Sequence, residues 1–170
     1  MASPFYNYTI ATFTRGLNTV STLLKKGEEY AKENNIPLDE FLNARLVEDM
    51  KPLSFQVATA TNTVSKALAR AASVEPLPQQ ELDKTYEDLY KRIDRALAEL
   101  EKADPAKIAL KEGQVFKAPL GKEEFDFTLE DYSVRFAIPN FYFHVVTVYE
   151  ILRVKGVQIG KMDYLSDFMA

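Results

Sequence analysis

Hydrophobic residues recur at intervals of three and four along most of the chain, which is the spacing that one face of an α-helix requires. The first such stripe follows Ser3 and Pro4, a pair typical of a helix start, so we expect a helix from there to about Asn34. The stripe consists of Ile10, Phe13, Leu17, Val20 and Leu24.

Three more helical segments are expected before the sequence DPA. IPLDEFLNARLVEDMKP predicts a short helical turn between two prolines, and Asp49 is placed to cap the next helix, with Pro52 in its first turn. That helix covers LSFQVATATNTVSKALARAA, and the loop VEPLPQQ follows it. ELDKTYEDLYKRIDRALAELEKA predicts the most amphipathic helix, whose apolar side is formed by Leu82, Leu89, Ile93, Leu97 and Leu100.

The last third of the chain predicts a hairpin and then a final helix. QVFKAPL and EFDFTL, joined by a GK turn, form the hairpin because Phe125 and Phe127 alternate with polar residues. Thr128 is expected to cap the final helix, which Pro139 interrupts and Gly156 ends. Four long helical segments with a hairpin inserted before the last predict an all-α four-helix bundle, formed as a single domain over residues 1–170.

Composition narrows the classes of function. A net charge of −4 and a pI near 5.2 argue against nucleic-acid binding, since a phosphate backbone would be repelled. No apolar run approaches the roughly 20 residues of a membrane-spanning helix, and MASPFYNYTI does not read as a signal peptide, so a cytoplasmic protein is expected. Cysteine is absent, and neither a GxSxG-like serine nor a phosphate-binding glycine loop occurs, which disfavours hydrolases, kinases and dinucleotide enzymes.

The only histidine, His144, lies in the aromatic segment PNFYFHVVTVYEILRVKG. Asn140 precedes it by four residues, so a helix would place both side chains on one face, one turn apart. A lone histidine in such a segment is most often a hydrogen-bonded core residue, but an acid/base role is an alternative, and a metal-ligand role is the least favoured. Tyr142 would add a phenol that can donate a proton to a carbonyl in an enolisation, cyclisation or dehydration.

A second polar group is ARLVED, where Arg45 and Asp49 stand at the spacing of a helical ion pair. Such a pair is the simpler interpretation. In the functional alternative, Arg45 recognises an acidic substrate group with its planar fork of donors, and Asp49 acts as a base or orients His144.

The segment HVVTVYEILRVKG resembles the end of the last helix in the DinB/YfiT-like superfamily of metal-binding four-helix bundles, with Leu152, Arg153 and Gly156 at matching distances after His144. Asn140 takes the place of the first histidine in that superfamily's HxxxH. TFTRGL, ARLVEDMKPL, PNFYFHV and GVQIGKMDYL resemble still more closely its member family called domain of unknown function nineteen-ninety-three. The resemblance implies a bundle with a central pocket and no settled activity.

The superfamily's metal triad takes its third histidine from near the start of the second helix, where this chain offers Gln56 as the inward-facing polar residue. An amide at that position and at Asn140 can orient a ligand carbonyl or a water, but it holds a divalent transition metal poorly. We therefore expect no tightly bound metal and no cofactor.

These observations favour a metal-independent enzyme or binder of a small organic ligand, with a pocket of aromatic walls and polar tips and a reaction of the isomerisation, cyclisation or dehydration type. Whether the protein is catalytic stays open. The rival hypotheses are a non-catalytic homodimeric bundle with a structural polar network and a residual DinB-like metalloenzyme. The expected catalytic residues are His144, Tyr142 and Asp49, and the expected substrate-binding residues are Asn140, Gln56 and Arg45.

Overall fold

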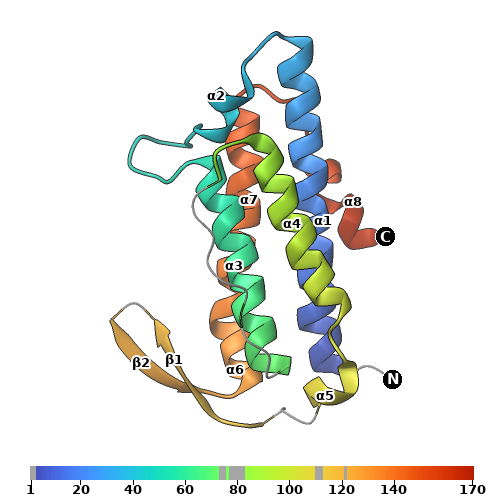
Figure 1. Ribbon diagram of the computed structural model, residues 1–170, viewed down its shortest axis with the longest axis vertical. Coiled ribbons are helices and arrows are strands. Elements are labelled where there is room, and N and C mark those ends of the chain that lie inside the picture. The colour runs from blue at the N-terminus through green and yellow to red at the C-terminus, as the bar shows by residue number, and fades with distance from the viewer. Residues whose placement is uncertain (1–2, 73–75, 77–82, 110–112, 121) are drawn as a thin grey trace.

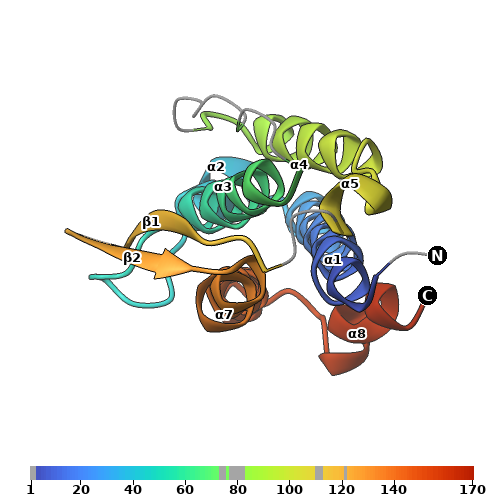
Figure 2. The same cartoon turned by 90° about the horizontal axis from the view of Figure 1, so that it is seen from below.

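The computed structural model describes residues 3–72, 76, 83–109, 113–120 and 122–170. Four long helices run side by side (Figures 1 and 2), which confirms the predicted bundle. They are α1 (Pro4–Glu33), α3 (Leu53–Ala72), α4 (Tyr86–Glu101) and α7 (Ile138–Val154). The shorter elements are α2 (Leu38–Leu42), α5 (Pro105–Ala109), strands β1 (Phe116–Leu120) and β2 (Glu123–Phe127), α6 (Leu129–Tyr132), the π-helical turn η1 (Ser133–Ala137) and α8 (Lys161–Met169).

Three helix starts are capped by the side chains that helix-capping rules select. The Ser3 hydroxyl accepts a hydrogen bond from the Tyr6 amide, and the Thr128 hydroxyl accepts one from the Asp131 amide. Thr85 and Asp88 form a reciprocal capping box, so α4 begins at Tyr86, several residues later than the sequence pattern predicts.

The apolar stripes meet in one core. All five predicted stripe residues of α1 are buried, as are Leu89, Ile93 and Leu100 of α4, whereas Leu97 is half-buried and Leu82 lies outside the described residues. The Phe141 ring lies against the backbone of Gly16, where a Cβ atom would collide with it. This close approach draws α1 and α7 together in the middle of the bundle.

The antiparallel β1–β2 hairpin precedes the last long helix, as predicted, and projects from one end of the bundle beside α3 (Figure 1). The helix after it is not interrupted at Pro139 but widens into the π-helical turn η1 just before this residue. A proline lacks the amide hydrogen and its ring crowds the carbonyl four residues earlier, so a wider turn lets the chain stay helical. Gly156 ends α7 in the left-handed conformation, with φ of +92°.

Two short helices were not predicted. α5 begins within the DPA sequence, at Pro105, and α8 packs along α1 (Figure 2). α8 is held by an ion pair of 3.0 Å between Lys26 and Asp163 and by a hydrogen bond of 3.0 Å from Thr22 to Asp167. The predicted loop VEPLPQQ lies outside the described residues except for Pro76. None of the described helices combines the length and the apolar character that crossing a membrane requires.

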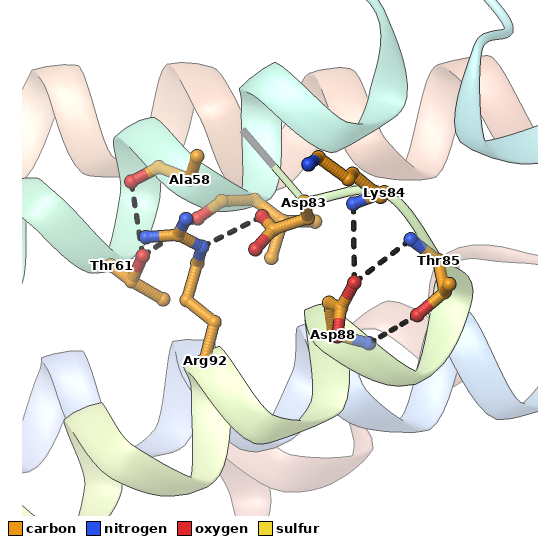
Figure 3. A network of polar contacts seen from close by, with 8 residues as sticks. Ala58, Thr61, Asp83, Lys84, Thr85, Asp88 and Arg92 are labelled. Carbon is orange, nitrogen blue, oxygen red and sulfur yellow. Dashed lines mark hydrogen bonds and ion pairs between the residues drawn. The ribbon is translucent and has the colours of Figure 1, made fainter. Parts of the chain in front are cut away.

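A buried ion pair lies where α4 contacts α3. Arg92 donates from Nε to the Asp83 carboxylate at 2.7 Å, and both side chains are almost fully buried. Figure 3 shows the guanidinium group beside Ala58 and Thr61 of α3, close to the Thr85–Asp88 capping box. The start of α4 is therefore fixed by one buried charge pair and one exposed cap.

Candidate functional site

His144 lies on the face of α7 that packs against α3, and its ring is held by Gln56. The His144 Nδ1 atom is 2.7 Å from Gln56 Oε1, and Gln56 Nε2 donates to the main-chain carbonyl of Lys51 at 2.8 Å. Because the amide nitrogen is committed to a carbonyl acceptor, the amide oxygen faces the ring. Nδ1 must then carry the ring hydrogen, and Nε2 carries the lone pair.

The Nε2 atom of His144 has a different environment from Nδ1. Within the part of the chain that the structure describes, no hydrogen bond involves Nε2, and no fully buried side-chain nitrogen or oxygen lacks a partner. Nε2 must therefore reach the surface, which agrees with the 8% exposure of the residue. The ring therefore has one hydrogen-bonded nitrogen, Nδ1, and one nitrogen, Nε2, without a partner in the described residues.

Burial sets the charge of this ring. It lowers the pKa of His144 below the usual 6.5, because the imidazolium form would lose hydration. His144 is thus neutral at neutral pH. The Phe55 and Phe143 rings meet it edge to face at centroid distances of 6.3 and 5.3 Å, and the Lys51 ammonium lies 6.0 Å from the centre of the Phe55 ring.

Asn140 forms a second polar bridge between the same helices. Its Nδ2 donates to the Thr63 hydroxyl at 2.8 Å, and that hydroxyl donates to the Thr59 carbonyl at 2.8 Å. We call Gln56, Thr63, Asn140 and His144 the polar seam. The structure thus brings Gln56, Asn140 and His144 to one interface, as the sequence predicts.

Tyr142 is not part of the polar seam. Its ring stacks at 5.9 Å on Phe168 of α8, on the side of α7 that faces α1 and α8. Burial raises the pKa of the Tyr142 phenol, and the nearby Arg15 guanidinium lowers it in part. The phenol is therefore placed away from the bridge between His144 and Gln56.

Arg45 and Asp49 lie in a turn between α2 and α3, and the expected helical pair between them is wrong. Arg45 instead donates from Nη1 to the Met50 carbonyl at 2.6 Å. Asp49 is exposed, forms no hydrogen bond or ion pair within the described residues, and does not cap α3. The error has a local cause, because i, i+4 spacing brings side chains together only on a helix.

Three residues that were not predicted from the sequence complete the polar seam and the surroundings of His144. Lys51 supplies the carbonyl that orients Gln56, Thr63 supplies the hydroxyl that holds Asn140, and Phe55 covers one edge of the imidazole. A usable signal was present for Thr63, which stands seven residues, or two helical turns, after Gln56 on the same face. No sequence pattern points to a main-chain carbonyl such as that of Lys51.

The donor set of the polar seam is a poor fit for a transition metal. It offers one imidazole and two neutral amides, and the Gln56 oxygen already accepts from His144. Among the described residues, no group of three or more histidine, aspartate or glutamate side chains is placed to hold an ion. The seam is suited instead to hydrogen bonding with an organic group.

Comparisons with known proteins give the family. The model of the domain of unknown function DUF1993 matches residues 5–165, nearly the whole chain. The chain belongs to this family. The crystal structure of a DinB family member protein from Shewanella denitrificans superposes with a TM-score of 0.80 at 29% identity, covering 94% of this chain and 90% of that one. No curated protein matches. This DUF1993 protein is therefore a DinB-like bundle, as the resemblance of its sequence implies.

Proposed function

We propose that this DUF1993 protein binds a small organic molecule at the polar seam and that His144 Nε2 accepts a hydrogen bond or a proton from it, without a metal. The observation that carries this proposal is the asymmetry of the ring. The chain from the Lys51 carbonyl through Gln56 fixes Nδ1–H, while Nε2 has no partner within the described residues and reaches the surface. A ring held on one side and free on the other is the arrangement of an oriented base.

The chemistry follows from the charge state. A neutral imidazole can remove a proton from a carbon next to a carbonyl or from a hydroxyl group, which is the first step of an isomerisation, cyclisation or dehydration. The lowered pKa of His144 keeps this base unprotonated at neutral pH. Lys51, whose ammonium lies by the Phe55 ring, can offset negative charge that develops on the ligand.

The other side chains take supporting roles in this proposal. Gln56 is a positioning residue, because it acts on the ligand only through His144. Asn140 uses Nδ2 toward Thr63, so its carbonyl oxygen is the atom with which it would accept a hydrogen bond from a ligand. Arg45 holds the turn that ends at Lys51. A cytoplasmic location is part of the proposal.

The single histidine makes the test direct, because every histidine signal in an NMR spectrum belongs to His144. Protein labelled at histidine should show hydrogen on Nδ1 and none on Nε2, and small ketones, enones and hydroxy acids that bind should shift the Nε2 signal. In Gln56→Leu the preference for the Nδ1–H form should weaken. A free protein with hydrogen on Nε2 would rule the proposal out.

Metal independence has its own test. Calorimetric titration with zinc or nickel should give no sub-micromolar binding to the wild-type protein. Tight binding that disappears in His144→Ala would contradict metal independence and would support the rival hypothesis of a residual DinB-like metalloenzyme.

A second candidate is a purely structural polar seam in a non-catalytic bundle, homodimeric or not. One observation favours it: every fully buried side-chain nitrogen and oxygen in the described residues is hydrogen-bonded. Comparing native with denaturing mass spectrometry of the purified protein separates the two candidates. A co-purified small molecule supports binding. A protein without a co-purified molecule, whose His144 NMR signal is not shifted by any tested compound, supports the structural role. Light scattering gives the oligomeric state.

A further inference from the structure

The opposite end of α3 carries a different kind of site, formed around Arg70. Two pockets, of about 470 and 340 Å³, share Ala69 and Arg70 near the end of α3, and both are also lined by residues of the β1–β2 hairpin. Volumes of roughly 300 to 1,000 Å³ are usual for small-molecule sites. We call the two together the Arg70 pocket. The residues that matter here are Lys66, Tyr132 and Phe136 in the larger part and Phe116 and Lys117 in the smaller one.

The Arg70 guanidinium is held by contacts with aromatic rings and by hydrogen bonds from one of its nitrogens, Nη1. Nη1 donates to the Tyr132 hydroxyl at 2.8 Å and to the Lys66 carbonyl at 3.4 Å. The central carbon lies 4.4 Å from the Tyr132 ring centre and 5.5 Å from that of Phe116. Nη1 makes both of these hydrogen bonds, so the donors of the other two nitrogens stay available. Nη2 and Nε have no hydrogen-bond partner within the described residues.

The charge of the Arg70 pocket is the reverse of that of the whole protein. The chain carries a net charge of −4, yet the described lining of both parts includes Lys66, Arg70 and Lys117 and no carboxylate. Among the residues that the structure describes, none of these three cations forms an ion pair. Cations gathered in a concave, partly apolar surface attract an anion more strongly than the same charges spread in water.

We propose that the Arg70 pocket binds an organic anion with a flat apolar body, of the aromatic carboxylate or phosphate monoester class. The free edge of Arg70 grips two oxygens of the anion, and Lys66 or Lys117 adds a second positive charge. The rings of Phe136 and Tyr132 cover the apolar body.

This site is separate from the polar seam. Arg70 follows Gln56 by 14 residues on one helix, which corresponds to about 21 Å along the axis. The proposal therefore does not depend on the function proposed for His144.

The test uses phenyl phosphate as the probe, with binding measured by calorimetry and mapped by NMR. Phenyl phosphate should bind and shift signals of Tyr132 and Phe136. Benzoate tests the carboxylate class, inorganic phosphate the anion alone and benzyl alcohol the apolar body alone. Both of the last two should bind at least about tenfold more weakly than phenyl phosphate, because each lacks one half of the recognition.

Variants assign the binding to Arg70. Arg70→Gln should weaken phenyl phosphate binding at least about tenfold, and Arg70→Lys should weaken it too, since lysine keeps the charge but lacks the planar fork. Arg95→Gln, which removes the same charge from α4 outside the pocket, should leave binding unchanged, as should His144→Ala.

If Arg70→Gln fails to fold, the double variant Lys66→Gln with Lys117→Gln should still weaken binding about threefold or more. Undetectable binding of both phenyl phosphate and benzoate to the wild-type protein would overturn the proposal. So would equal binding by benzyl alcohol, or full binding by Arg70→Gln.

Discussion

Buried polar contacts lie on two sides of helix α3, toward α4 and toward α7, and the two contacts differ in kind. Toward α4, Thr61 and Ala58 lie beside the ion pair of Arg92 and Asp83 (Figure 3). Toward α7, Gln56 meets His144 in a contact between neutral groups. Both contacts are buried, but one is charged and the other is not.

The difference separates a structural contact from a candidate functional one. A buried charge is tolerated only when it is paired and hydrogen-bonded, so the Asp83 carboxylate is committed to Arg92. A neutral imidazole can be buried with one hydrogen bond and still keep a free acceptor at the surface, as His144 does. Under the function proposed above, it is this uncommitted atom, more than burial or residue type, that distinguishes the seam between α3 and α7 from the ion pair.

The largest effect is expected at the ion pair. Asp83→Ala leaves the Arg92 charge buried without its carboxylate and should lower the free energy of unfolding by about 3–5 kcal/mol. Urea denaturation measures this loss. The matched control is Lys91→Ala, which removes an exposed pair with Glu87 and should change stability by no more than about 1 kcal/mol. Equal losses in the two variants would show that the buried pair has no special structural role.

At the neutral contact the effect should be smaller. Gln56→Ala leaves the Nδ1–H of His144 and the Lys51 carbonyl without their partner, which should cost about 1–3 kcal/mol. The same urea experiment applies. A loss as large as that of Asp83→Ala would remove the distinction between the two sides of α3.

Lowering the pH should weaken the fold through His144. The folded-state pKa of His144 lies below the usual 6.5, so the unfolded chain takes up a proton first. Stability is therefore constant above the unfolded pKa and is lost as the pH falls from about 6.5 to the lower folded value. His144→Gln should remove this slope when urea midpoints are followed downward from neutral pH. A slope that survives the substitution would assign it to other groups.

The smallest effect is expected for Tyr142→Phe. The phenol stacks on Phe168 at the other side of α7, so its removal should leave the NMR titration of His144 unchanged. Phe55→Leu is the contrasting variant, since it removes a ring beside the imidazole and should shift that titration. A shift caused by Tyr142→Phe would place the phenol within the polar seam after all.

Much of the fold was readable from residue spacing, and the site was readable in part. The bounds of α1 and α3, the hairpin and the caps at Ser3 and Thr128 follow from local rules, because each depends on residues only a few positions apart. The grouping of Gln56 and Asn140 with His144 was also predicted. Arg45 and Asp49 were misplaced because a helical spacing was assumed in a segment that turns.

The sequence by itself determined a helical bundle with one histidine on an aromatic helix, because hydrophobic periodicity and capping act over short stretches of chain. Only the tertiary structure decided which nitrogen of that histidine is free, that Tyr142 faces away from it, and that Arg70 lies between aromatic rings. These features arise where distant segments meet, at α3 with α7 and at α3 with the hairpin. The orientation of a side chain there depends on partners that no local pattern specifies.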